Sequence, residues 1–251
     1  MITGDLREPY NPPIDKHSHN LRDLLHFRLA ALDGDIGHIS DFYFDDQNWV
    51  VRYLVVNTGS WLTGRLVLLT PHSFGSFGVT EKTLRINLHK NQVKNSPPVE
   101  MHKPVSRQYE AEYYRYYGLP SYWAGGALWG ATAYPIVPLS TDDPHETRLL
   151  YHHRDDKHLQ STNALVGYQL LTDDGPIGHV RGFLVDDRNW EISQIVVETG
   201  HWYAGKEILV SPSKVLGISY EGSQIKVSLS KSDIEETGKN AHAYASLAVH
   251  Q

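Results

Sequence analysis

The sequence contains no cysteine, which excludes a disulfide scaffold, a thiol nucleophile, an iron–sulfur cluster and a thiolate zinc site. It also lacks any apolar run near the roughly 18 residues of a membrane-spanning helix. The first 20 residues are polar and hold no apolar signal-peptide segment. We therefore expect a soluble, cytoplasmic protein without membrane insertion.

An excess of positive charge is missing as well. The 251 residues hold 23 Lys and Arg against 29 Asp and Glu, a net charge of −6 with histidine neutral. Nucleic-acid binding needs a basic surface that neutralises phosphates, so we expect no nucleic-acid partner. The 15 histidines are more unusual, because an unperturbed imidazole titrates near pH ~6.5 and protonation of all 15 would move the net charge from −6 to +9 (−6 + 15).

An internal repeat organises the sequence. Residues 33–39 (DGDIGHI) return as 174–180 (DGPIGHV), and residues 45–49 (DDQNW) return as 186–190 (DDRNW). The offset is 141 in both cases, and 18 of the 39 positions from Asp33 to Pro71 are identical to their counterparts. The chain therefore carries two copies of one unit, and we expect both copies to have the same fold.

Each copy is predicted to be all-β, because short runs of Val, Ile, Leu and aromatic residues are bounded by Gly, Asp and Asn. In the first copy we expect strands at 27–31, 36–44, 49–57, 66–70, 77–79 and 84–89. The Asp-Asp-x-Asn segment between the second and third strands predicts a hairpin turn, since Asp and Asn bond to nearby backbone and tolerate positive φ. Short antiparallel strands that cannot bury their faces as a flat sheet favour closure into a small barrel.

These motifs resemble the PRC-barrel family, whose fold occurs in the cytoplasmic part of the photosynthetic reaction-centre H subunit and in the C-terminal domain of a ribosome-maturation factor. The resemblance rests on D-G-x-I-G-H, D-D-x-N-W, the Leu54-Val55-Val56 strand, T-G-x-W and the exit Leu68-Leu69-Thr70-Pro71. It implies a docking and scaffolding module rather than a catalyst. The expected parts are a polar N-terminal arm (1–23), a first PRC-barrel-like domain (24–95), a Tyr- and Trp-rich linker (96–164), a second PRC-barrel-like domain (165–236) and a C-terminal tail (237–251).

The linker between the two copies is rich in aromatic residues, with nine between Tyr109 and Tyr134. The spacing of four tyrosines predicts a short helix over 107–117 with one aromatic face. That face could pack on the chain's own barrels, or it could form a protein interface, where Tyr and Trp are enriched. The candidate partner-binding residues are Tyr109, Tyr113, Tyr116, Tyr117, Tyr122, Trp123 and Trp129, with Trp61 and Trp202 from the T-G-x-W segments.

No arrangement of residues predicts catalysis. The adjacent carboxylates of Asp45-Asp46 point in different directions from an exposed turn, so we assign them to the turn rather than to acid–base chemistry. His38 and His179 occupy equivalent positions and are weak candidates for pH sensing. The histidines at 145, 152, 153 and 158, before the second copy, and those at 17 and 19 match no zinc spacing, so we interpret them as solvated and expect no metal and no cofactor.

The sequence thus favours a non-enzymatic interaction or scaffold module that forms a homo-oligomer, with a dimer expected and any further protein partner unknown. Two other functions stay open: an RNA- or ribosome-associated processing factor, which the charge disfavours, and a histidine-based sensor of pH or metal. A role like that of the reaction-centre subunit would follow only from analogy of fold.

Overall fold

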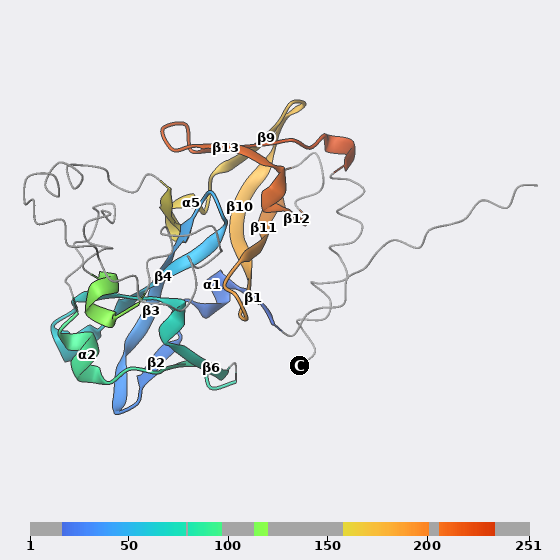
Figure 1. The fold of residues 1–251 in the computed structure, drawn as a ribbon. Helices are drawn as coiled ribbons and strands as arrows, with labels where there is room; N and C mark the ends of the chain where they lie inside the picture. The colour runs from blue at the N-terminus through green and yellow to red at the C-terminus, as the bar shows by residue number, and fades with distance from the viewer. Residues whose placement is uncertain (1–16, 79, 97–112, 120–157, 201–205, 234–251) are drawn as a thin grey trace, which may run out of the picture. The chain divides into compact units, whose positions relative to one another are not determined.

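The computed structural model describes residues 17–78, 80–96, 113–119, 158–200 and 206–233, and these residues are mainly β (Figure 1). The chain forms two compact units. Unit 1 consists of residues 1–23 and 162–251, and unit 2 consists of residues 24–161. Each unit contains one seven-stranded sheet. In the part of the chain that the structure describes, no helix has the length and apolar character needed to cross a membrane.

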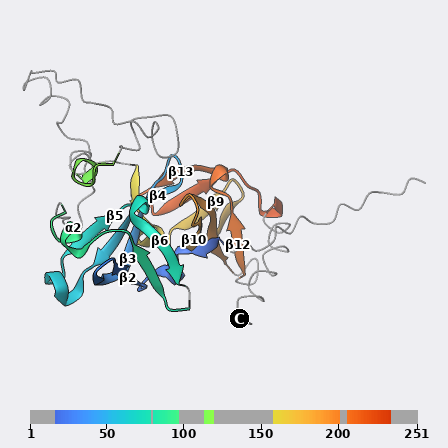
Figure 2. The same cartoon turned by 60° about the horizontal axis from the view of Figure 1, so that its bottom comes forward.

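The sheet of unit 2 has the strand order β5-β4-β3-β2-β7-β6, and β8 pairs with β3 outside this path (Figure 2). Its strands are β2 (Arg28–Ala31), β3 (Gly34–Asp45), β4 (Val50–Asn57), β5 (Leu66–Leu69), β6 (Phe74–Gly78), β7 (Thr83–Ile86) and β8 (Leu159–Ser161). Short helices join or flank them: η1 (Gly59–Leu62), η2 (Pro71–Ser73), α2 (Lys90–Lys94) and a helical turn at 113–117.

The sheet of unit 1 repeats this order as β12-β11-β10-β9-β14-β13, with β1 paired to β10 outside the path. Its strands are β1 (Ser18–Asn20), β9 (Gln169–Thr172), β10 (Gly175–Asp186), β11 (Ile192–Thr199), β12 (Glu207–Val210), β13 (Val215–Ser219) and β14 (Gln224–Val227). Its helices are α5 (Thr162–Leu165) and η5 (Pro212–Lys214), while α1 (Leu21–Leu24) spans the point where the chain passes from unit 1 to unit 2.

The expectation of purely antiparallel sheets is wrong, because both sheets are mixed. Strand β2 pairs with β7 in parallel, with Leu29 opposite Leu84, and β9 pairs with β14 in parallel. The strands β2 to β5 follow one another as an antiparallel meander. The chain then forms the β6–β7 hairpin, and β7 returns beside β2 in the same direction. A crossover of this kind depends on contacts between residues about 55 positions apart (84 − 29), which local strand patterns do not reveal.

A glycine in each copy allows two strands to approach closely. A Cβ atom at Gly37 would lie 2.1 Å from the carbonyl oxygen of Asn57, and one at Gly178 would lie 2.1 Å from that of Glu198. Any side chain there would collide with the backbone of the neighbouring strand. The second glycine of the D-G-x-I-G-H motif is therefore required by the packing of β3 on β4 and of β10 on β11.

Strand β4 is the most deeply buried element of unit 2, with every residue from Val50 to Val56 buried. A strand at a sheet surface alternates between buried and exposed residues, so continuous burial means that both faces of β4 are covered. Its counterpart β11 is less continuous, because Ser193 is exposed and Gln194 is only half-buried. In unit 2 the helical turn at 113–117 covers the second face of β4, and the described residues of unit 1 contain no counterpart of this turn.

Candidate functional site

The hairpin predicted from the D-D-x-N-W motif joins β3 to β4, and the first aspartate holds its turn. Asp45 accepts hydrogen bonds from the backbone N–H of Gln47 at 2.9 Å and from the side-chain amide of Asn48 at 2.8 Å. The residue with positive φ is Trp49, at 55°, rather than Asp or Asn. Its N–H donates to the Asp45 carbonyl at 2.7 Å, a bond that the left-handed conformation permits.

In unit 2 the first aspartate also binds a buried arginine. Arg52 is 1% exposed, and its Nη2 donates to Asp45 Oδ2 at 2.9 Å. Burial acts to raise the pKa of Asp45, but the bonds from Asn48, Arg52 and Gln47 outweigh it and hold that pKa below its ordinary value. In unit 1 the counterpart Asp186 instead pairs with Arg188 at the surface.

The second aspartate of each turn binds a strand that lies outside its own repeat. In unit 1, Asp187 Oδ1 lies 2.8 Å from His17 Nδ1, and Asp187 Oδ2 lies 2.9 Å from His19 Nε2. Since a carboxylate only accepts hydrogen bonds, the ring nitrogens that face it carry the protons. The backbone N–H of Asp187 also donates to the His17 carbonyl at 2.9 Å, which fixes the end of β1 on β10.

Unit 2 repeats this arrangement with residues 141 positions away. His158 Nδ1 lies 2.9 Å from Asp46 Oδ1, and the Asp46 N–H donates to the His158 carbonyl at 2.9 Å. Strand β8 follows His158 and pairs antiparallel with β3. We call residues 182–187 the docking site of unit 1 and residues 41–46 the docking site of unit 2.

The two docking sites differ at more than one position. His19, which lies 2.9 Å from Asp187, has Gln160 as its counterpart, and the next residue of each strand also meets a different partner. In unit 1 the amide of Asn20 lies against Gly182, where a Cβ atom would come within 2.8 Å of Asn20 Oδ1. In unit 2 the equivalent pair is Ser161 and Asp41, with the serine Oγ donating to the carboxylate at 2.5 Å. In unit 1 the larger Asn20 side chain thus packs on a glycine, whereas in unit 2 the small Ser161 side chain donates a hydrogen bond to a carboxylate.

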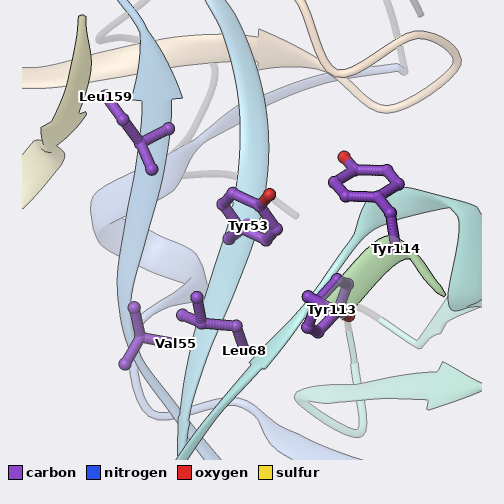
Figure 3. Packing of buried hydrophobic residues seen from close by; sticks show 6 residues of the cluster. All are labelled: Tyr53, Val55, Leu68, Tyr113, Tyr114 and Leu159. Carbon is purple, nitrogen blue, oxygen red and sulfur yellow. The ribbon is translucent and has the colours of Figure 1, made fainter. Parts of the chain in front are cut away.

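The helical turn at 113–117 packs on the outer face of β4 and β5 in unit 2 (Figure 3). Tyr113 and Tyr114 are 1% and 2% exposed and lie against Tyr53, with Tyr113 at a ring-centroid distance of 5.5 Å in an edge-on arrangement. The Tyr113 hydroxyl accepts a hydrogen bond from the buried N–H of Thr70 at 3.0 Å. These tyrosines therefore belong to the core of unit 2, and the reading in which the aromatic stripe packs on its own chain applies to them.

The other two tyrosines of the turn lie nearer the surface. Tyr117 contacts Tyr113 with ring centroids 4.7 Å apart and the ring planes tilted by 48°, and burial raises its pKa to about 12. Tyr116 is 42% exposed, and its hydroxyl donates to the carbonyl of Gln92 at 2.9 Å. The residue is thus held against α2 while its ring faces solvent.

Trp61 also lies against α2. The ammonium group of Lys90 is 4.6 Å from the Trp61 ring centroid, within the range of a cation–π contact. Trp61 is half-buried. We call Trp61, α2 and Tyr116 the α2 surface: two aromatic residues from distant parts of the chain contact one short helix of unit 2.

The remaining candidates are not brought together. His38 is half-buried, with its ring centroid 6.2 Å from that of His26, whereas His179 is exposed. Five candidate residues lie outside the described residues: Tyr109, Tyr122, Trp123, Trp129 and Trp202. The same holds for three of the histidines near the second copy, those at 145, 152 and 153. Among the residues that the structure describes, no three His, Cys, Asp or Glu side chains are placed to hold a metal ion.

Sequence reasoning missed the docked strands, because it interpreted His17, His19 and His158 as solvated. A signal was present: the offset of 141 that relates Asp46 to Asp187 also relates His17 to His158 (158 − 17). The two copies are clearly similar only from Asp33 onward, so one matching histidine 16 positions earlier does not stand out. Comparison of the sequence with known protein families and with curated proteins finds no match.

Proposed function

We propose that this chain is a non-catalytic protein-interaction module of the PRC-barrel type that self-associates. The motifs that resemble the family have structural tasks in both units: the glycine permits close strand packing, and the first aspartate holds the hairpin turn. The observation that carries the proposal is the α2 surface. It presents Trp61 and Tyr116 to solvent on a scaffold of packed tyrosines.

The chemistry of the α2 surface suits a protein partner. Tyr and Trp combine a large apolar area with few rotatable bonds, so they lose little conformational entropy when a partner covers them. They are also over-represented among the residues that dominate binding energy at interfaces. Here the Gln92 carbonyl already fixes Tyr116, and Lys90 already covers one side of Trp61. The two rings are held in position before any partner arrives.

Light scattering coupled to size exclusion tests the proposal. The full-length protein should run as a dimer, and the double variant Trp61→Ser/Tyr116→Ser should run as a monomer at the same concentration. Tyr220→Ser is the matched control, because Tyr220 lies in unit 1 and is 40% exposed against 42% for Tyr116. It should leave the dimer intact.

Point substitutions are preferable to deleting the aromatic segment, since a deletion of residues 105–134 would also remove Tyr113 and Tyr114 from the core of unit 2. A dimer that survives the double variant would show that the α2 surface is not the interface. A wild-type protein that is monomeric at every concentration would refute self-association itself.

A further inference from the structure

The two docking sites form a reciprocal exchange of strands within one chain. Strand β1 immediately precedes the repeat that builds the sheet of unit 2, yet it pairs with β10 in unit 1. Strand β8 precedes the repeat that builds the sheet of unit 1, yet it pairs with β3 in unit 2. The registers correspond, because Ser18 opposite Asp186 becomes Leu159 opposite Asp45 when 141 is added or subtracted.

We propose that β1 also exchanges between two copies of this chain, so that β1 of one copy occupies the docking site of unit 1 in the other. The proposal rests on the self-association proposed above: it adds a second contact, which forms between two copies that the α2 surface already holds together. Every interaction that holds β1 within one chain is available between two chains: the antiparallel pairing with β10, the two histidine bonds to Asp187 and the fit of Asn20 against Gly182.

The turn that follows β1 and α1 is strained in a way that favours opening. His26 adopts φ of 69°, the left-handed region that residues with a Cβ atom avoid. Its counterpart 141 positions later is Gly167, at φ 92°, where glycine adopts the same region at no steric cost. Both residues donate the equivalent hydrogen bond, His26 to Ile39 and Gly167 to Val180. The strain therefore lies beside β1 and not beside β8.

Strained hinge segments favour exchange between chains, because an open hinge releases the strain while the docked contacts are made again in the partner. A left-handed residue other than glycine shifts such an equilibrium by about 5- to 30-fold. We therefore expect β1 to exchange between copies and β8 to stay within its own chain.

The difference between the docking sites also determines where β1 binds in the partner. Asn20 lies where Gly182 leaves space, whereas the same position in unit 2 is filled by the Asp41 carboxylate, which accepts a hydrogen bond from Ser161. Placing β1 on β3 would set the asparagine against this side chain. The second copy is thus expected to receive β1 in unit 1 only.

The absence of cysteine makes cross-linking a direct test. Asn20 lies opposite Leu184 in the β1–β10 pairing, and Ser161 lies opposite Tyr43 in the β8–β3 pairing. Cα atoms of residues directly opposite in an antiparallel pair are about 4.5–5.5 Å apart, a separation that a disulfide spans. Full-length Asn20→Cys is mixed with full-length Leu184→Cys under mild oxidation, and Ser161→Cys is mixed with Tyr43→Cys in parallel.

The first mixture should give a dimer linked between residues 20 and 184, identified by mass spectrometry, in about 5- to 30-fold higher yield than the linked dimer of the second mixture. Chains that carry both cysteines of one site serve as folding controls. They should close that disulfide at either site, whether within one chain or between two.

If both control chains close their disulfides but no bond between residues 20 and 184 joins two chains, β1 does not exchange and the inference is overturned. Equal yields from the two mixtures would overturn the role of the strained turn. A dimer seen by light scattering without this cross-link would still support the proposed function, and a protein that stays monomeric would refute both proposals.

Discussion

Replacing Tyr113 by phenylalanine should destabilise unit 2 through one buried hydrogen bond. The substitution keeps the ring that packs edge-on against Tyr53 and removes only the hydroxyl that accepts from the Thr70 N–H. Thr70 is fully buried, so its N–H loses an acceptor in a place that bulk water does not reach. Leaving a buried donor unsatisfied costs about 1–3 kcal/mol.

Amide hydrogen exchange followed by mass spectrometry measures this loss of stability in individual peptides of the chain. For amides that exchange through opening of unit 2, a loss of about 1–3 kcal/mol raises the exchange rate about 5- to 150-fold. The effect should appear in peptides that cover β4 and β5, which pack beneath Tyr113. Peptides that cover β10 and β11 in unit 1 supply the internal reference.

Tyr116→Phe is the matched control on the same helical turn. It removes an exposed hydrogen bond to Gln92, whose carbonyl can bond to water instead, so the rate should change by less than about threefold. The reasoning is refuted if Tyr113→Phe exchanges as slowly as wild type, or if the two variants behave alike. Either result would mean that the tyrosine turn does not stabilise the face of β4 on which it lies.

Two further tests address the hairpin and the close strand contact. Asp45→Asn should lower the free energy of unfolding by about 3–5 kcal/mol, because it leaves the buried Arg52 guanidinium without its carboxylate. Asp186→Asn is the control, since it breaks a surface ion pair worth about 1 kcal/mol or less. Similar losses of Tm for the two variants would contradict this reasoning. The pKa of Asp45 is held low in the folded protein, so its stabilisation is complete above the unfolded value near ~3.9 and is lost as the pH falls through the folded pKa. Acid titrations of unfolding should therefore be flatter for Asp45→Asn than for wild type below about pH 4. Gly178→Ala should lower the Tm by several degrees, because its Cβ atom would collide with the backbone of β11. Gly217→Ala is the control and should leave the Tm unchanged, since a Cβ atom there faces open space. An unchanged Tm for both variants would show that β10 and β11 can separate enough to accept a side chain.

Local patterns predicted those parts of the fold that local forces determine. Short apolar runs bounded by Gly, Asp and Asn located the strands of the first copy to within a few residues, and the D-D-x-N segment located the hairpin between β3 and β4. The helix α2 was not predicted, although His89 and Gln92 form a capping box at its start. A five-residue helix has too few apolar positions to show a period, so only its cap could have indicated it.

The features that sequence reasoning missed depend on distant contacts. Strand β1 has three residues and shows no alternation, and it exists because it pairs with residues about 170 positions away. The parallel pairing of β2 with β7 likewise depends on how the chain returns after the meander. The burial of Tyr113 followed from helical spacing only as one of two alternatives, because a stripe of tyrosines does not reveal whether its own chain or another protein covers it.

The strand exchange gives the chain an interlocked architecture in which the repeated segment and the folded unit are different pieces. A single cut between residues 97 and 157 would yield one fragment with the main sheet of unit 2 and the β1 strand of unit 1, and another with the main sheet of unit 1 and the β8 strand of unit 2. Each fragment would lack a strand that the other holds, so the two fragments would stay associated non-covalently through the pairing of β1 with β10 and of β8 with β3. For the same reason, a truncation drawn at the edges of the repeat would give neither unit complete, and a separable half has to be assembled by joining residues 17–23 to the segment that begins at 162.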